Sequence, residues 1–241
     1  MNYYLYCVTE KLSKFDHSTP GVSDQLVEVI SFDDFDIVVS QAKETTVPVT
    51  RENVLRHESV VRKVLAEKTP LPCRFGLIES KEGIESFAKA RATSLVARLG
   101  EVRDCVELSV KVIWRGPEPE SAPSETDTVQ ELGSGAAFLQ AKRKELLGDQ
   151  KLAVEAEKIS EWLRDLLFEV SRTQMANVQP KEKLVFAGSY LVRRERVAEF
   201  REKLTHAMDE RVDLHFLISG PWPPYTFANI DLEFKTQFGV S

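Results

Sequence analysis

The amino-terminal part of the chain carries the hydrophobic patterns of three strands. Residues 2–9 are aromatic and apolar almost without interruption, which predicts a strand buried on both faces. Two shorter apolar runs, at residues 26–31 and 35–40, flank a polar turn that contains Asp33 and Asp34. Apolar runs on either side of a short polar turn are typical of a β-hairpin, so we expect these two runs to pair.

Two amphipathic helices are predicted to follow. Thr50 can cap a helix that runs to Lys68. Ser80 can cap a second helix, for which Gly100 supplies the stop signal. Between the helices, two prolines within residues 69–76 favour an extended edge strand or the entry to a turn. The apolar stripe of the first helix comprises Val54, His57, Val61, Val64 and Leu65.

The clearest strand pattern spans residues 104–114. Apolar positions alternate there with polar ones such as Glu107, which predicts one buried side and one side that faces solvent. The acidic, proline-rich residues 116–131 predict a mobile loop, because they contain too little apolar surface to offset the entropy of ordering. Residues 134–177 are helical in composition, and an unbroken helix of that length would span roughly 65 Å. We therefore expect a bend near Gly148.

The remaining elements complete a β-α-β-α-β order that begins at Asp104. Residues 184–192 predict a buried strand, residues 197–208 an amphipathic helix, and residues 212–218 a half-buried strand. This order is one strand short of the βαββαβ unit of ferredoxin-like folds. The missing strand could lie in residues 178–192, or the unit could be modified. Since strands and helices mix without regular alternation, the sequence predicts an α+β fold with two small sheets.

Composition places the chain among ordinary globular proteins. It has 241 residues, 42% hydrophobic and 29% charged, and 32 basic against 38 acidic side chains give a net charge of −6. A general nucleic-acid or anionic-membrane binder would carry excess positive charge, so neither class is expected. Three widely spaced cysteines exclude a disulfide framework and favour a reducing cytoplasm. We find no targeting segment and no apolar run of membrane-spanning length, and we expect an intracellular protein.

The search for catalytic, cofactor and metal motifs is negative. His57 and Glu58 begin like a zinc-binding HExxH motif, but the fifth residue is Val61. One histidine and one acid cannot hold zinc, so we expect His57 to be a partly buried core residue rather than a ligand. No phosphate-binding glycine loop and no nucleophile motif is present. The sequence therefore predicts no catalytic residue, no cofactor and no metal.

Two features are candidates for contact with a partner protein. Arg74 lies between Cys73 and Phe75, where strand alternation would turn it away from both neighbours. It is either an ordinary surface or ion-paired arginine, or an arginine that binds a partner through bidentate hydrogen bonds. The segment GPWPPYTF, residues 220–227, is predicted to be extended, and its rings either pin it to its own domain or form a partner site. The candidate partner-binding residues are Arg74, Trp222, Tyr225 and Phe227.

Three blocks of sequence resemble one known protein family. They are the amino-terminal YYLYCV, the block LRHESVVRKVLAEKTPLPCRFGLI at residues 55–78, and the block FLISGPWPPYTF at residues 216–227. Together with the overall length, they are similar to the gas vesicle proteins of the GvpF/GvpL family, with the GvpF-like side favoured. The resemblance covers essentially the whole chain. Departures are small: Cys73 replaces a small apolar residue, and Cys7 stands near a position that is often glycine.

The resemblance implies two α+β domains, the second a modified ferredoxin-like domain, and then a carboxy-terminal tail. The corresponding ranges are 1–102 for the first domain, 103–220 for the second, which includes the loop 116–131, and 221–241 for the tail. It also implies a minor structural component or assembly factor of gas vesicles, located at the gas vesicle and devoid of enzymatic activity. The implied partners are the hydrophobic major shell protein and other gas vesicle proteins, with no nucleic acid and no lipid membrane.

Two functions of other classes remain as alternatives to a role in gas vesicles. A ferredoxin-like domain could instead bind a small ligand or catalyse a reaction, because that fold hosts many small-molecule sites. A pocket lined by convergent polar groups would favour it. An RNA-binding domain would need exposed aromatic and basic residues on a sheet face, and the acidic balance of the chain disfavours it.

Overall fold

A computed structural model describes residues 1–115, 152–177 and 184–228 of the chain. Helices and strands are mixed, and the α+β class predicted from the sequence is confirmed. Contacts divide the chain into two units, whereas the boundaries expected after residues 102 and 220 stay a prediction. The described residues of the first unit are 1–108, 191–194 and 220–228, and those of the second are 109–115, 152–177, 184–190 and 195–219.

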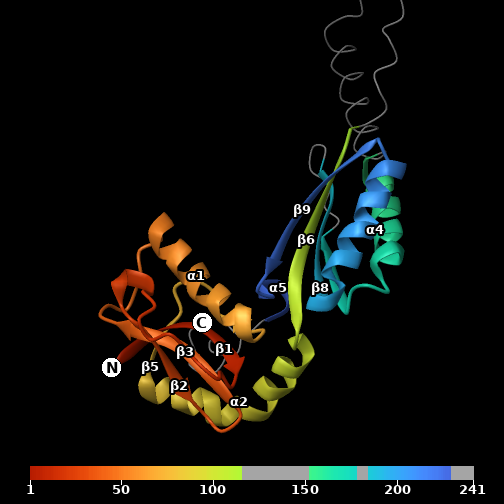
Figure 1. The fold of residues 1–241 in the computed structure, drawn as a ribbon. Helices are drawn as coiled ribbons and strands as arrows, with labels where there is room; N and C mark the ends of the chain where they lie inside the picture. Colours follow the sequence, from red (N-terminus) through yellow and green to blue (C-terminus); the bar gives the residue numbers. More distant parts are fainter. Residues whose placement is uncertain (116–151, 178–183, 229–241) are drawn as a thin grey trace, which may run out of the picture. The chain divides into compact units, whose positions relative to one another are not determined.

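A five-stranded sheet in the order β2-β3-β1-β4, with β5 also paired to β1, forms the centre of the first unit (Figure 1). All of its pairings are antiparallel, and β2 and β3 form the predicted hairpin. Strand β1 has β3 along one side and β4 and β5 along the other, so β2 is left at an edge. The strands are β1 (Asn2–Glu10), β2 (Val27–Ser31), β3 (Phe35–Ala42), β4 (Leu71–Pro72) and β5 (Ile78–Ser80).

Helices α1 (Arg51–Glu67) and α2 (Lys81–Val102) cover opposite faces of this sheet (Figure 1). Both predicted caps are confirmed, because the Thr50 and Ser80 hydroxyls each accept a hydrogen bond from the backbone N–H three residues further on. The prediction that Gly100 ends the second helix is wrong, since α2 continues to Val102 and buries its last side chain. A short 3-10 turn, η1 (Val22–Asp24), precedes β2.

Strand β1 is buried on both faces, as its uniform hydrophobicity predicts. Its register with β3 shifts between Leu5 and Cys7, so Tyr6 is an extra residue in the strand. Because of this bulge, Tyr6 and Cys7 both pack in the core beneath α1, while Val8 returns to the core beneath α2. Strict alternation does not foresee this arrangement.

The second sheet has the order β7-β8-β6-β9 and belongs to a ferredoxin-like βαββαβ unit (Figure 1). The helix over residues 152–167 follows β6 in this unit, and α4 follows β8. The prediction of helix as far as residue 177 is wrong, because β7 is the missing strand and lies before the range 178–192 considered for it. Amino-acid composition alone does not predict such a strand, because the strand forms through its pairing with β8. The elements are β6 (Cys105–Trp114), β7 (Thr173–Asn177), β8 (Leu184–Arg193), the 3-10 turn η2 (Arg194–Arg196), α4 (Val197–Glu210) and β9 (Leu214–Trp222).

Two further predictions concern residues that the structure does not describe. The loop at 116–131 and the bend near Gly148 both lie outside the described residues. Within the described part, no helix is long and apolar enough to cross a membrane.

Candidate partner-binding surface

The Pro-aromatic segment at the end of β9 is ordered by its own unit. It was predicted to be extended throughout, but β9 runs to Trp222 and a short helix, α5 (Tyr225–Ala228), follows. The carboxylate of Glu107 accepts hydrogen bonds from the backbone N–H of Thr226 at 2.9 Å and from its hydroxyl at 2.6 Å. Two hydrogen bonds to one charged group therefore fix the start of α5.

Glu107 reverses the prediction made for β6. Strand alternation places it on the solvent side, yet it is only 5% exposed, and the whole range 105–108 is buried. The reason is tertiary: the segment around Thr226 lies over this carboxylate, so the polar side of β6 is covered where it begins. A buried charge is tolerated only with such partners.

Phe227 and Ala228 attach the segment to the core of the first unit. Ala228 is buried in the core beneath α2, and the half-buried Phe227 packs against that core. Phe227 therefore packs against its own unit, and its part in a partner site stays a prediction. The tail of the first unit is thus held by apolar packing as well as by Glu107.

Trp222 lies under a cation from α1. The guanidinium carbon of Arg62 is 4.5 Å from the centroid of the half-buried indole, within the range of a cation–π interaction. Glu58, one turn earlier on α1, binds the same guanidinium at 2.9 Å. The sequence contains no signal for this arrangement, since Arg62 has the ordinary pattern of a surface helix position.

Tyr225 is 40% exposed and its ring centroid is 6.5 Å from that of His57. His57 is 4% exposed, and its Nδ1 lies 2.9 Å from the Tyr4 hydroxyl. That hydroxyl accepts a hydrogen bond from the N–H of Gly76 at 3.1 Å, which leaves its proton for Nδ1. The prediction that His57 is a core histidine is confirmed by its burial.

The environment of His57 keeps it neutral. Burial lowers its pKa from 6.5 to about 4, although a hydrogen bond with the backbone of Cys73 acts in the opposite direction. Aromatic rings enclose it, with Tyr6 stacked at 5.6 Å and Phe75 edge-on at 5.9 Å between centroids. Within the described ranges, no group of three or more His, Cys, Asp or Glu side chains could hold a metal ion.

Arg74 is exposed, but not for the reason predicted. The strand expected over residues 69–76 shrinks to the two residues of β4, so Arg74 lies outside it, ahead of a turn at Gly76. Gly76 has φ of +89°, a backbone conformation that favours glycine. Cys73 and Phe75 consequently pack in different cores, on opposite faces of the sheet, rather than on a shared face.

The structure brings Trp222 and Tyr225, two of the four predicted residues, against α1. Tyr225 and Phe75, the neighbour of Arg74, both contact the His57 ring, and Trp222 contacts Arg62 on the same helix. Phe227 lies beneath them in the core. Sequence reasoning missed Glu107 and Arg62, which hold the segment in place. We call the set of Arg62, Trp222 and Tyr225 the α1–α5 surface. Arg74 is exposed, and its part in partner binding stays a prediction.

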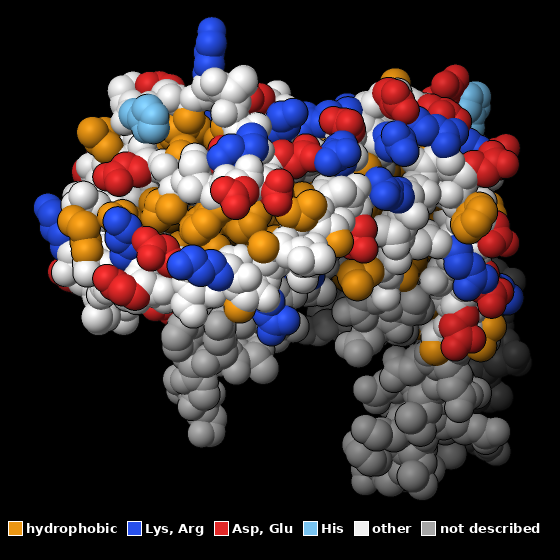
Figure 2. Space-filling model, turned by 90° about the horizontal axis from the view of Figure 1, so that it is seen from below, with side chains coloured by type: hydrophobic (Ala, Val, Ile, Leu, Met, Phe, Trp, Pro, Cys, Tyr) orange, Lys and Arg blue, Asp and Glu red, His pale blue; other side chains and the backbone are white. Residues whose placement is uncertain are grey.

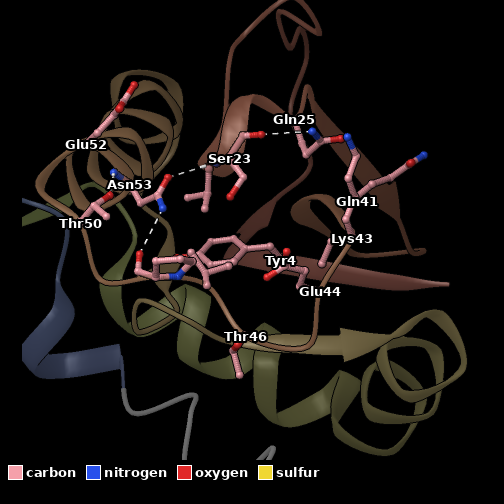
Figure 3. A pocket seen from close by; sticks show the side chains of 14 residues that line it. Tyr4, Ser23, Gln25, Gln41, Lys43, Glu44, Thr46, Thr50, Glu52 and Asn53 are labelled. Atoms are coloured by element: carbon pink, nitrogen blue, oxygen red, sulfur yellow. Dashed lines mark hydrogen bonds between the residues drawn. The ribbon is translucent and has the colours of Figure 1, made fainter.

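A separate polar pocket of about 410 Å³ lies near the start of α1 (Figure 3). The polar groups at the helix start have local partners. The Thr50 hydroxyl caps α1 by accepting from the N–H of Asn53, and the Asn53 amide bonds the backbone of Ser23 at 3.2 Å and of Pro48 at 3.1 Å. These groups therefore stabilise the loops around the helix start, and the pocket offers little support for a small-ligand site.

Comparison with known proteins identifies relatives along the whole length. The family described as gas vesicle synthesis protein GvpL/GvpF matches residues 2–229. Gas vesicle protein F1 of Halobacterium salinarum is 25% identical, with 99% of this chain and 98% of the relative covered. Gas vesicle protein L of Haloferax mediterranei is 29% identical, with 88% of this chain and 74% of the relative covered.

Two solved structures share the fold. The crystal structure of gas vesicle protein GvpF from Anabaena aligns with a TM-score of 0.73 at 22% identity, and covers 95% of this chain and 96% of its own. The structure of GvpF from Microcystis aeruginosa aligns with a TM-score of 0.71 at 20% identity and similar coverage. At these identities the likeness shows the fold alone.

Proposed function

This chain belongs to the GvpL/GvpF family of gas vesicle synthesis proteins and has a role related to gas vesicles, and we propose that it acts there as an assembly factor or minor structural component. In this proposal it binds the hydrophobic major shell protein without covalent chemistry, at the gas vesicle. The contact is made by the α1–α5 surface, with Phe227 as its support from the core.

The observation that carries this proposal is the fixed presentation of aromatic and cationic groups on one side of the first unit. Aromatic and arginine side chains are the residue types that most often dominate binding energy at protein interfaces. Here Tyr225 is 40% exposed, while Glu107 and Arg62 hold the surrounding segment before any partner arrives. Binding to a preordered surface loses less conformational entropy than binding that must order a free tail.

Several features support a function without catalysis. The one histidine in the aromatic cluster is buried, neutral and bonded to Tyr4. A general base would need access to a substrate and a pKa nearer the working pH. The pocket at the start of α1 uses its hydroxyl and amide groups to bond its own loops. A partner-binding role requires neither an accessible general base nor a pocket for a small substrate.

The proposal is tested by capture of purified shell protein on this immobilised chain. The double variant Trp222→Ala, Tyr225→Ala should weaken capture by about tenfold or more, because each truncation removes an aromatic contact. Phe168→Ala is the matched control, since Phe168 is a 72% exposed aromatic residue in the second unit.

Thermal unfolding of all variants separates binding from stability. Lost capture at an unchanged melting temperature supports a partner surface. Wild-type capture by the double variant would contradict it. A large fall in the melting temperature would assign both rings to the core of the unit and remove them from the interface. Deletion of the gene should in addition reduce the number or alter the shape of gas vesicles.

A further inference from the structure

The edge strand β2 has a covered start and an open end. The N–H of Val27 donates to the carbonyl of Thr19 at 3.1 Å, and Pro20 forms an isolated antiparallel bridge with Leu26. Beyond this point no strand pairs with the outer side of β2 in the described part of the chain. The exposed end of β2 is thus an unpaired sheet edge.

The register of the hairpin shows which backbone groups point outward. Phe32 donates its N–H to Phe35 within the hairpin at 2.9 Å. In an antiparallel pair, residues alternate between facing the partner strand and facing away from it. The backbone N–H and C=O groups of Glu28 and Ile30 therefore point towards β3. Those of Val29 and Ser31 point outward, away from the sheet. Among the described residues, no hydrogen bond reaches these outward groups of Val29 or Ser31.

Apolar side chains lie next to this open edge. Ile30 and Phe32 are half-buried and pack against the core beneath α2, and Phe32 stacks on Phe35 with ring centroids 5.2 Å apart. Figure 2 shows hydrophobic side chains gathered across the first unit between groups of charged ones. An added strand would therefore find both hydrogen-bonding groups and an apolar surface.

The charges at this edge are mainly acidic, and Lys11, which donates to the Phe32 carbonyl at 2.8 Å, is bound to Asp36. Glu28 lies in the strand and Asp33 and Asp34 lie in the hairpin turn, and no ion pair involves them among the described residues. Asp36, by contrast, is buried and bound by Lys11 at 2.8 Å. The open edge is thus bordered by acidic side chains whose charge is not balanced locally.

We propose that the β2 edge is a second docking site, which receives an extended segment of another protein. Because Glu28 and Ile30 are two residues apart and lie on one face of the sheet, the segment carries apolar and basic side chains in turn at every second residue, along that same face. The segment pairs with the outward groups of Val29 and Ser31 and extends the sheet by one strand. Its apolar side chains lie beside Ile30, and its basic side chains lie beside Glu28 and the acidic turn. Main-chain hydrogen bonds give affinity, and the cross-strand pairs give specificity.

The same charges disfavour a second copy of this chain as the occupant. Pairing of two β2 edges would bring Glu28 and the acidic turns of both copies together. Like charges opposite each other destabilise a strand pair, and charged edges are a common device against self-association. A basic partner segment has the opposite effect, since it neutralises these groups.

The experiment uses the full chain and a synthetic peptide in which valine and lysine occupy every second residue in turn, with threonine between them. The control is the same peptide with glutamate in place of lysine. Binding is measured by fluorescence anisotropy, and its location by hydrogen exchange of the Val29 and Ser31 amides. We expect the lysine peptide to bind and to protect both amides, and the glutamate peptide to bind far more weakly. Ser31→Pro should weaken binding about fivefold to tenfold, because proline removes one outward N–H.

Ser31→Ala is the matched control, since it keeps the N–H and should bind as the wild type does. Glu28→Lys should reverse the preference between the two peptides, and it also decides the question if Ser31→Pro fails to fold. Unchanged affinity in folded Ser31→Pro, unchanged preference in Glu28→Lys, or protection at amides outside β2 would each overturn the proposal. Dimerisation of the wild type that Ser31→Pro abolishes would overturn it in favour of a second copy.

Discussion

The two sides of the first unit differ in whether their polar groups have hydrogen-bond partners. On the α1–α5 side, Glu107, Tyr4 and His57 are buried, and each is bonded within the unit. At the β2 edge, the outward backbone groups of Val29 and Ser31 have no hydrogen-bond partner among the described residues. Buried polar groups need hydrogen-bond partners within the folded chain, whereas groups at an exposed edge can bond to water until a partner binds. Mutations of these buried polar groups should therefore affect stability, and mutations at the edge should not.

The largest effect is expected at Glu107. Glu107→Ala leaves the Thr226 N–H and hydroxyl without their acceptor, and hydrogen bonds to a charged group contribute more than neutral ones. We expect a loss of about 3 kcal/mol in the free energy of unfolding, measured by urea denaturation. Glu107→Gln, which keeps one carbonyl acceptor, should lose less. An unchanged urea midpoint in the alanine variant would show that α5 is held by apolar packing alone.

A comparable effect is expected from acid, through His57. Its pKa is lowered from 6.5 to about 4 on folding, mainly by burial, so the unfolded chain binds the proton more readily. The contribution of neutral His57 is complete above pH 6.5 and is lost as the pH falls towards 4, by about 3 kcal/mol in total.

The measurement compares unfolding free energies of the wild type and His57→Phe across this pH range. Carboxylates titrate in both proteins, so the difference between the two curves isolates the histidine. The wild type should lose stability more steeply than the variant between pH 6.5 and 4. Parallel curves would mean that His57 can be protonated without leaving its site.

The smallest effect is expected at the open edge. Ser31→Ala removes an exposed hydroxyl for which no hydrogen bond is present among the described residues, and surface changes of this kind usually stay within about 0.5 kcal/mol. Thermal unfolding of the isolated chain provides the test. A loss as large as that of Glu107→Ala would show that the edge is already closed by this chain, and the contrast between the two sides would fail.

Much of the secondary structure follows from local pattern. The strand at β1, the hairpin of β2 and β3, and the caps at Thr50 and Ser80 were all predicted, because hydrophobic periodicity and capping side chains act over a few residues. Family membership, first suggested by three sequence blocks, is confirmed by the match over residues 2–229.

The errors fall where pairing or packing with another segment decides the local structure. Residues 173–177 have a helical composition but form β7 because β8 pairs with them. The expected strand over residues 69–76 contracts to β4, since the chain turns at Gly76 to place Cys73 and Phe75 in different cores. In each case pairing or packing with another segment outweighs the local preference.

For the candidate surface, too, some features were indicated by the sequence and others were revealed only by the structure. The sequence by itself determined that Arg74, Trp222, Tyr225 and Phe227 are unusual residues in unusual segments, and that His57 belongs in a core. Only the tertiary structure decided that Phe227 is an anchor, that Arg62 covers Trp222, and that Glu107 is buried beneath Thr226. The physical reason is that burial of a side chain depends on what lies above it, and here that covering segment is more than a hundred residues away in the chain.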